Sequence, residues 1–427
     1  MEKEKGETME IQKFIDFIDK SPTSYQVARH FIEEAKGFTM LRPEDTWKLE
    51  EGKGYSLVVD DGGVLLFRLG SLNDDELAFK AVLSHTDSPL LKLLPGGVHD
   101  IDGGVRFDVE PYGAIIRSTW LDRPLSLAGR VLVEEDGVKS IPVDFGYALA
   151  TIPNLAPHLH REVNTGHVYE PGKDLVPLGG ESLKDGGFLK ELANVAGVKE
   201  DGILDYDLYF YAMEKAEAIG KNGEWLSAPR LDNLATAYPA FCALLDGKPS
   251  KATTMLYITD NEEVGSLTKS GGDSSFFANV LKRIALSIGE EAFYRALSRS
   301  FLMSADMAHA YHPNYVNFSN PSASPKLGEG VAIKTGAARS YATQGHSSAR
   351  FKALMKRQNL KVQYFANPHG QRGGSTIGPL SVRHVDIEAI DVGIPTWAMH
   401  SMREVVHVED VKDFYSAMKA FYEDDRF

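Results

Sequence analysis

Hydrophobic residues near the start of the chain recur every three or four positions. Two runs have this spacing, on either side of the helix-breaking letters SPTS, and their apolar positions are Ile11, Phe14, Ile15 and Ile18, followed by Val27, Phe31 and Ile32. Apolar residues at these intervals form a stripe along one side of an α-helix. The pattern therefore predicts two amphipathic helices.

Short apolar runs typical of β-strands follow the two helices: YSLVVD, GVLLFRL and LAFKAVLSH. From about Leu94 the chain changes to glycine-punctuated segments, GGVRFDVEPYGAIIRSTWL and LSLAGRVLVEEDGVKSIPVDF, which indicate antiparallel β-structure. From about Leu226 strands and helices alternate again, up to a final helical run, EDVKDFYSAMKAFYE. We expect an α/β domain, residues 1–93 plus 226–427, interrupted by a β-rich insertion, residues 94–225.

The composition narrows the class of protein. The net charge is −14, which argues against a broad surface for nucleic acid or an anionic membrane, because both require basic patches. Cys242 is the single cysteine, so no intrachain disulfide is possible. No apolar stretch approaches the length of about eighteen residues that a membrane span needs, and the start, MEKEKGETMEIQ, lacks the apolar run of a signal peptide. We expect a cytoplasmic protein.

The stretch YITDNEEVGS places Asp260, Glu262 and Glu263 directly after an apolar strand. Adjacent carboxylates repel each other, so the cluster indicates a bound cation or a catalytic task. Four other strand-like runs end in residues that could bind a metal, namely His85 with Asp87, then Asp232, Asp306 and His400. Because the active sites of open α/β sheets lie at the carboxyl ends of strands, these residues can converge.

Two histidines together with Asp and Glu oxygens suit zinc or a similar divalent ion. Five ligands and a further glutamate exceed the needs of one tetrahedral site, which indicates two metal ions sharing a bridging carboxylate. One glutamate of the pair could then be a ligand while its neighbour acts as a base.

Each of these residues, considered alone, could also have an ordinary structural role and bind no metal. The histidines could be core or loop residues, and Asp306 and the Glu262–Glu263 pair could cap helices. Asp87 could orient the ring of His85. The shared placement at strand ends favours the metal site.

Six segments, in the order SHTDSP, APRLDNL, TDNEEVGS, SADMAHAYHPNY, GGSTIGP and MHSMRE, resemble the aspartyl aminopeptidase and aminopeptidase I family of dinuclear zinc exopeptidases. The resemblance implies a Rossmann-like peptidase domain, with a mixed sheet and helices on both faces, and an inserted β-rich domain that mediates dimerisation and partly lids the site. Family members typically form tetrahedral dodecamers with the active sites facing an internal chamber. We therefore expect a homo-oligomer of this kind.

The resemblance also implies a role for each residue of the metal site: one zinc on His85 and Asp306, a second on Glu263 and His400, a bridge at Asp232, and the general base at Glu262. In relatives the peptide bond after the bridging aspartate is cis, so we expect the same of Asp232–Asn233. Zinc is the expected metal, with cobalt or manganese as alternatives at one site.

Further segments resemble substrate-binding parts of the family. TIPNLAPHLHR corresponds to a segment that supplies a histidine, here His158, to a neighbouring subunit, with a plain loop histidine as the alternative. Lys334 and Tyr341 match positions near the P1 side chain in acid-selective members, with a solvated surface lysine as the alternative. Ser375 and Thr376, in GQRGGSTIGPLS, could add hydroxyl contacts, or the segment could be a turn between helix and strand.

Two segments depart from the mammalian-type pattern. The segment FANPHGQR puts Arg372 close to the substrate region, and the small residues TGAARS follow Lys334. A second cation would strengthen selection for acidic P1 side chains, whereas a reshaped pocket would abolish it. We expect a metal-dependent aminopeptidase for short peptides that prefers Asp or Glu at P1, with a broad-specificity aminopeptidase as the alternative.

Two further hypotheses assign the protein to other functional classes. A related dinuclear deacylase or carboxypeptidase would need a group that holds a free carboxylate, for which Arg372 is the obvious candidate. A non-enzymatic shell protein with a vestigial metal site is disfavoured, because Glu262 is present beside the ligands.

Overall fold

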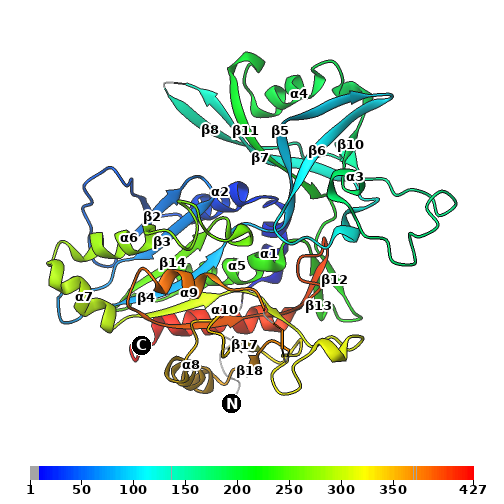
Figure 1. Cartoon of the computed structure of the whole chain (residues 1–427). Coiled ribbons are helices and arrows are strands. Elements are labelled where there is room, and N and C mark those ends of the chain that lie inside the picture. The colour runs from blue at the N-terminus through cyan, green and yellow to red at the C-terminus, as the bar shows by residue number, and fades with distance from the viewer. Residues whose placement is uncertain (1–8, 136, 369, 372) are drawn as a thin grey trace.

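The computed structural model of the chain describes residues 9–135, 137–368, 370–371 and 373–427. Over these residues the strands form three sheets, of nine, seven and five strands. The nine-stranded and five-stranded sheets share one body with most of the helices, and the seven-stranded sheet projects from it (Figure 1). The protein is therefore of the mixed α/β class.

The nine-stranded sheet is mixed, and its central strands are buried on both faces. β4 (Phe79–His85) and β14 (Thr253–Thr259) pair in parallel, and every residue of both is buried. β15 (Phe301–Ala305) pairs in parallel with the other edge of β4. Continuous apolar runs are typical of strands covered on both faces. The outer strands are β1 (Thr39–Met40), β2 (Gly54–Val59) and β3 (Gly63–Arg68) on one side, and β19 (Glu388–Gly393), β17 (Val331–Lys334) and β18 (Val362–Phe365) on the other.

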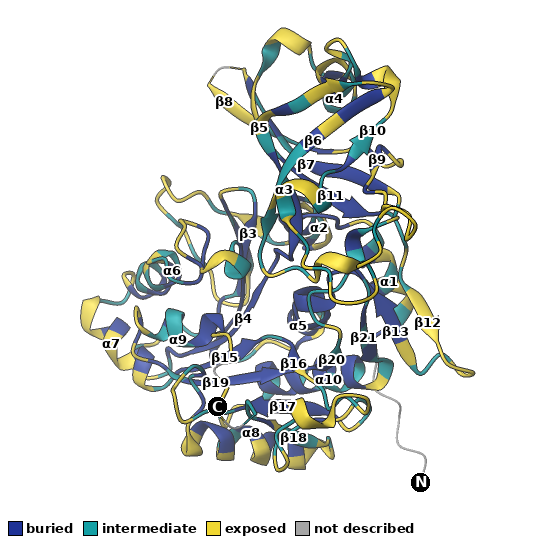
Figure 2. Ribbon diagram, turned by 45° about the vertical axis from the view of Figure 1, so that its right-hand side comes forward, coloured by how far each residue is buried: buried dark blue, intermediate teal, exposed yellow. Residues whose placement is uncertain are grey.

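Helices cover both faces of this sheet. Alternate residues of the strands divide between the two layers: Leu256 packs with the first group of helices, and Met255 and Tyr257 pack with the second. Figure 2 shows the buried strands between partly exposed helices. The first group is α1 (Ile11–Asp19), α2 (Ser24–Glu34), α5 (Leu231–Asp246), α8 (Gly345–Gln358) and α10 (Val408–Glu423), and the second is α6 (Phe276–Ala285), α7 (Glu290–Ser298) and α9 (Ile377–Val382).

The seven-stranded sheet is antiparallel, as the glycine-punctuated segments predicted. β11 pairs with both β5 and β7, so the sheet closes on itself, and β8 pairs with the outside of β7. Phe107, Leu127 and Phe210 lie in its own hydrophobic core, separate from the cores of the large sheet. The elements are β5 (Leu90–Ile101), β6 (Gly104–Tyr112), β7 (Leu125–Glu134), β8 (Val138–Asp144), β9 (Ala150–Thr151), α3 (Pro171–Asp174), β10 (Leu178–Gly179), α4 (Gly187–Ala196) and β11 (Ile203–Ala212).

The five-stranded sheet was not predicted. It joins the chain that leaves the seven-stranded sheet to segments near the C-terminus, because β13 pairs with β21. The runs before Asp232 and His400 were recognised as strand-like, but strands of two to four residues carry too little pattern to show that they form a sheet of their own. In spatial order they are β12 (Glu217–Ile219), β13 (Trp225–Ala228), β21 (Glu404–His407), β20 (Pro395–Trp397) and β16 (Ala308–His309).

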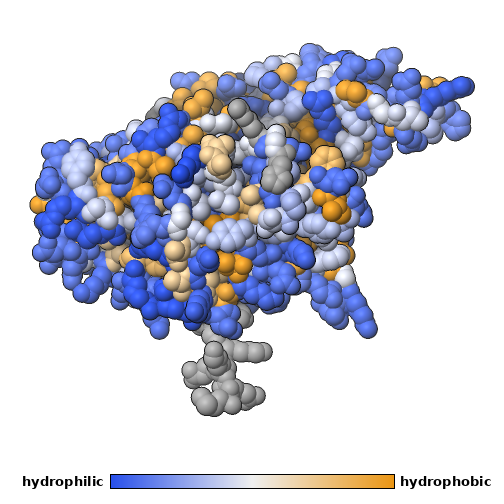
Figure 3. Space-filling view, turned by 60° about the horizontal axis from the view of Figure 1, so that its bottom comes forward, coloured by the Kyte–Doolittle hydropathy of each residue, from blue (hydrophilic) through white to orange (hydrophobic). Residues whose placement is uncertain are grey.

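The surface shown in Figure 3 is mainly hydrophilic. Figure 3 shows a face on which hydrophilic residues predominate and hydrophobic residues form small separate groups. In the described part of the chain, the helices are all too short or too polar to cross a bilayer.

Candidate metal centre

Five residues with metal-binding side chains converge from two of the three sheets. His85 ends β4, Glu263 follows β14 and Asp306 follows β15, all in the nine-stranded sheet. Asp232 stands in the first turn of α5, which follows β13, and His400 lies between β20 and β21 of the five-stranded sheet. The strand ends indicated by the sequence thus belong to two sheets. Asp306 is followed by strand β16, so its alternative as a helix cap is wrong.

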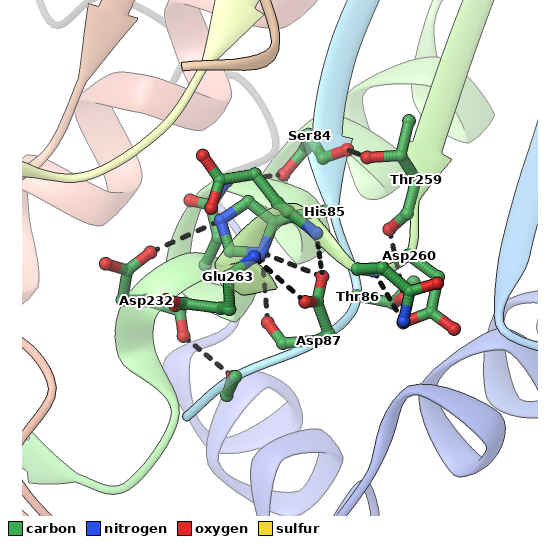
Figure 4. A network of polar contacts seen from close by, with 12 residues as sticks. Ser84, His85, Thr86, Asp87, Asp232, Thr259, Asp260 and Glu263 are labelled. Atoms are coloured by element: carbon green, nitrogen blue, oxygen red, sulfur yellow. Dashed lines mark hydrogen bonds and ion pairs between the residues drawn. The ribbon is translucent and has the colours of Figure 1, made fainter. Parts of the chain in front are cut away.

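The side chains form two groups that share Asp232. His85 Nε2 lies 3.5 Å from Asp232 Oδ1 and 3.7 Å from Asp306 Oδ1. His400 Nε2 lies 3.5 Å from Asp232 Oδ2 and 3.5 Å from Glu263 Oε2. Figure 4 shows the His85 ring between Asp232 and Asp87. Asp232 therefore presents one oxygen to each histidine, which is the arrangement of a bridging carboxylate.

The residues fit divalent metal ions. Two ligand atoms bound at about 2.0 Å to a tetrahedral zinc lie about 3.3 Å apart, which is close to the observed separations. Asp232 Oδ1 and Glu263 Oε1 are buried and accept no hydrogen bond. A buried carboxylate oxygen without a donor is costly, and a cation removes that cost.

The charges of the cluster also favour a bound cation. Burial lowers the pKa of His400, but Asp232 and Glu263 raise it to about 10. Burial also lowers the pKa of His85, yet Asp232 and Asp306 raise it well above its usual value. Burial raises the pKa of Asp232, but the two histidines hold it well below its ordinary range. The carboxylates attract positive charge, and metal ions would take the place of the histidine protons.

Glu262 differs from its neighbour Glu263. It lines a cavity beside the cluster, and burial raises its pKa to about 8 despite the opposing effect of His85. Glu263 Oε2, by contrast, faces His400. Both glutamates line the cavity and both come within reach of His85, but only Glu263 also belongs to the group with Asp232 and His400.

Asp87 supports the loop that carries this pair. Its carboxylate accepts hydrogen bonds from the backbone N–H of Glu262 at 3.2 Å and of Glu263 at 3.1 Å. The sequence suggested that Asp87 orients the ring of His85. Its closest contact to the ring is through the backbone, because the Asp87 carbonyl lies 2.9 Å from His85 Nδ1 while carboxylate Oδ1 lies 3.4 Å away.

Glu404 supports the other half of the cluster, and sequence reasoning missed it. Its Oε2 accepts from Asp232 N at 2.8 Å and its Oε1 accepts from His400 N at 2.7 Å. Burial raises the pKa of Glu404 to about 8. The available signal was a charged residue in the apolar strand EVVH, four positions after His400. The Asp232–Asn233 peptide bond is cis, as expected.

The cavity beside the cluster has a volume of about 390 Å³. Lys334 lines it, is 4% exposed, and places Nζ 2.8 Å from Asp306 Oδ2 and 5.5 Å from the centre of the Tyr341 ring. Lys334 is therefore not a solvated surface lysine. The other residues of the predicted substrate region that line the cavity are Tyr341, Ser375 and Thr376.

The remaining candidate substrate residues are not all available at the cavity. Thr376 donates its hydroxyl hydrogen to Asp391 at 2.5 Å, so that group is already engaged. His158 is exposed in the connection between β9 and α3, which extends outward as an open loop (Figure 1), and it does not line the cavity. Arg372 lies outside the described residues. His309, which the sequence did not single out although it stands in SADMAHAYHPNY, lines the cavity.

Comparison with known proteins places the chain in a family. It matches the family model described as aminopeptidase I zinc metalloprotease (M18) over residues 17–422. It is 39% identical over 423 residues to a probable M18 family aminopeptidase 2 of Clostridium novyi, covering 96% of this chain and 97% of the relative. A protein of the same description from Pseudomonas savastanoi pv. phaseolicola is 37% identical over 417 residues, covering 96% of each.

Comparison with solved structures agrees with this family. A chain in the cryo-EM structure of the Ape4 and Nbr1 complex matches with a TM-score of 0.92 at 31% identity, covering 96% of this chain and 85% of that one. A chain of the S. cerevisiae mApe1 dodecamer matches with a TM-score of 0.82 at 27% identity, covering 96% of this chain and 95% of that one. The chain therefore belongs to the M18 family of zinc metallo-aminopeptidases.

Proposed function

We propose that the protein removes N-terminal residues from short peptides with two divalent metal ions per subunit, zinc being expected and cobalt or manganese possible at one site. The observation that carries this proposal is the shared carboxylate. Asp232 lies 3.5 Å from a nitrogen of each histidine, through a different oxygen each time. One group would be completed by Asp306 and the other by Glu263.

Divalent ions held by these residues would lower the pKa of a water molecule and polarise the scissile carbonyl. Glu262 is the proposed general base: it takes a proton from the attacking water and delivers it to the leaving amine. Its position at the cavity wall, outside both groups that contain Asp232, supports this role. Burial raises its pKa to about 8 when no metal ion is bound, and adjacent dications would lower that pKa, so that the carboxylate could accept and release a proton near neutral pH.

The proposal extends to the architecture. We propose a Rossmann-like peptidase domain, expected at residues 1–93 plus 226–427, and an inserted domain for dimerisation that partly lids the site, expected at residues 94–225. The seven-stranded sheet itself begins at Leu90 with β5 and ends at Ala212 with β11, and β12 belongs to the five-stranded sheet. The helices on both faces of the nine-stranded sheet support the first part. A contact between the chain after β6 and the metal centre supports the second, because the Ala114 carbonyl lies 2.9 Å from His400 Nδ1. A cytoplasmic location agrees with the single cysteine.

We further propose a preference for Asp or Glu at P1. Lys334 and Tyr341 lie on the cavity wall, and a buried ammonium attracts an acidic side chain and repels a basic one. A broad-specificity aminopeptidase is the second candidate. It is favoured by the ion pair of Lys334 with Asp306, which offsets the charge that would face P1.

A panel of unblocked, N-acetylated and C-terminally blocked peptides, assayed with zinc, cobalt or manganese, tests the activity. An aminopeptidase cleaves unblocked and C-blocked peptides and spares N-acetylated ones. Cleavage that requires a free C-terminus would instead indicate a carboxypeptidase, and removal of the acetyl group a deacylase.

Metal removal tests the two-ion centre. We expect a strong chelator to abolish turnover and added zinc or cobalt to restore it, because the attacking water is activated near neutral pH only beside metal ions. Metal analysis should give two ions per subunit in the active protein. Full turnover after verified metal removal would overturn the proposal.

A further inference from the structure

The chain that leaves the seven-stranded sheet after β6 reaches the metal centre. Tyr112, the last residue of β6, donates its hydroxyl hydrogen to Asp87 Oδ2 at 2.8 Å. The same hydroxyl oxygen accepts from Asn261 Nδ2 at 2.9 Å. One hydroxyl thus joins Asp87, which follows β4, to Asn261, which directly precedes the glutamate pair.

Both partners of this hydroxyl control the backbone of the pair. Asp87 accepts the N–H groups of Glu262 and Glu263. Asn261 immediately precedes them and has a left-handed backbone, with φ of 62°. A non-glycine residue in this region needs support from its surroundings. The Tyr112 hydroxyl therefore links the acceptor of the two N–H groups to the residue where the loop turns.

Packing fixes the tyrosine itself. Its ring contacts Tyr209 of β11 edge to face, with ring centroids 5.5 Å apart. Burial raises its pKa far above the ordinary value, so the hydroxyl stays protonated. The next residue, Gly113, has φ of 72°, and a Cβ at this position would come within 3.1 Å of Glu263 Cβ. The backbone after β6 therefore lies directly against the glutamate pair.

We infer that Tyr112 is a positioning residue: acting through Asp87 and Asn261, it holds Glu262 and Glu263 in place and couples the seven-stranded sheet to the catalytic loop. This inference rests on the proposed roles of Glu262 as base and Glu263 as ligand. The hydroxyl itself does not need to touch substrate or metal.

The variant Tyr112→Phe tests this, since it keeps the ring packing and removes only the hydroxyl. Tyr147→Phe is the matched control, because its hydroxyl also donates to a carboxylate, Glu191, at 2.8 Å, in an exposed part of the same region. The first measurement is a cobalt titration of the metal-free proteins. Tyr112→Phe should weaken binding of one cobalt ion by about tenfold, as expected for loss of a hydrogen bond to a charged group, while Tyr147→Phe leaves it unchanged.

The second measurement is steady-state kinetics after metal loading. We expect kcat of Tyr112→Phe to fall by about tenfold with KM within about twofold, because the base is displaced while substrate contacts remain. A double-mutant cycle with Asp87→Asn then tests the route through Asp87: once Asp87 is changed, removal of the hydroxyl should cost less than in the wild type, and the part that remains belongs to the contact with Asn261.

Two results would contradict the positioning role of Tyr112. If Tyr112→Phe matches the wild type in cobalt affinity and kcat, or if its effect simply multiplies that of Asp87→Asn, Tyr112 does not position the loop through Asp87. Wild-type protein that binds no cobalt and cleaves no peptide would contradict the proposed function, and the inference with it.

Discussion

At the scale of single residues, Glu262 and Glu263 are adjacent in sequence but have different surroundings. Glu262→Gln should leave the metal content nearly intact and lower kcat by a factor on the order of a hundred or more, because a general base is lost. Glu263→Gln should instead lower occupancy of one metal site. Elemental analysis and kcat of both variants measure this, and the reverse pattern would show that the two roles are exchanged.

A second prediction at the scale of single residues concerns Lys334. Lys334→Ala should reduce kcat/KM most for substrates with Asp or Glu at P1, because a buried charge-assisted contact is removed. Lys361→Ala is a control, since that lysine is exposed and pairs with Glu329 at 3.0 Å. Acidic, neutral and basic aminoacyl substrates measured on both variants decide the question. An equal loss on every substrate would show that Lys334 acts through its ion pair with Asp306 and does not select P1.

At the scale of elements, the first turn of α10 anchors the loop before β17. Asp410 accepts the N–H of Gly328 at 2.7 Å and of Gly330 at 2.8 Å. Burial raises its pKa from 3.8 to about 7. The folded carboxyl thus binds its proton more tightly than the unfolded one, so its contribution to stability falls as pH rises between about 4 and 7.

The variant Asp410→Asn lacks this titration. The free energy of unfolding of the wild type, relative to the variant, should therefore be lower at pH 8 than at pH 5. Denaturant titrations of both metal-free proteins at the two pH values measure the difference. A difference that does not change with pH would mean that Asp410 is not protonated preferentially in the folded state.

The same scale shows what the sequence can and cannot predict. Long periodic segments were predicted, since α10 and the buried strands β4 and β14 carry their own apolar pattern. His85, Glu263 and Asp306 were found because they end or follow buried strands of this kind, and Asp232 and His400 because they follow shorter strand-like runs. Glu404 and Tyr112 were missed, because their importance comes from contacts with Asp232 and Asp87, which are 172 and 25 residues away along the chain. No local pattern encodes such contacts.

At the scale of the whole molecule, the open loop between β9 and α3 carries exposed apolar side chains. Leu155, Leu159 and Val168 in this loop are 53%, 75% and 77% exposed. Exposed apolar side chains gathered on a projecting loop are typical of protein interfaces. Together with the dodecameric mApe1 relative, they support the proposal that the chain forms a closed homo-oligomer in which His158 reaches a neighbouring site.

This arrangement predicts complementation between two defective subunits. Glu262→Gln lacks the proposed base but keeps His158, and His158→Ala keeps the base but supplies no histidine to its neighbour. In oligomers formed by equal co-expression, a site works when its own subunit has Glu262 and its neighbour has His158, which gives about a quarter of wild-type activity by random pairing. Separately purified variants, mixed without exchange of subunits, should stay near their own low activities. Light scattering on the same samples checks the assembly, and a monomer, or co-expressed activity no higher than the average of the two variants, would show that His158 does not act across subunits.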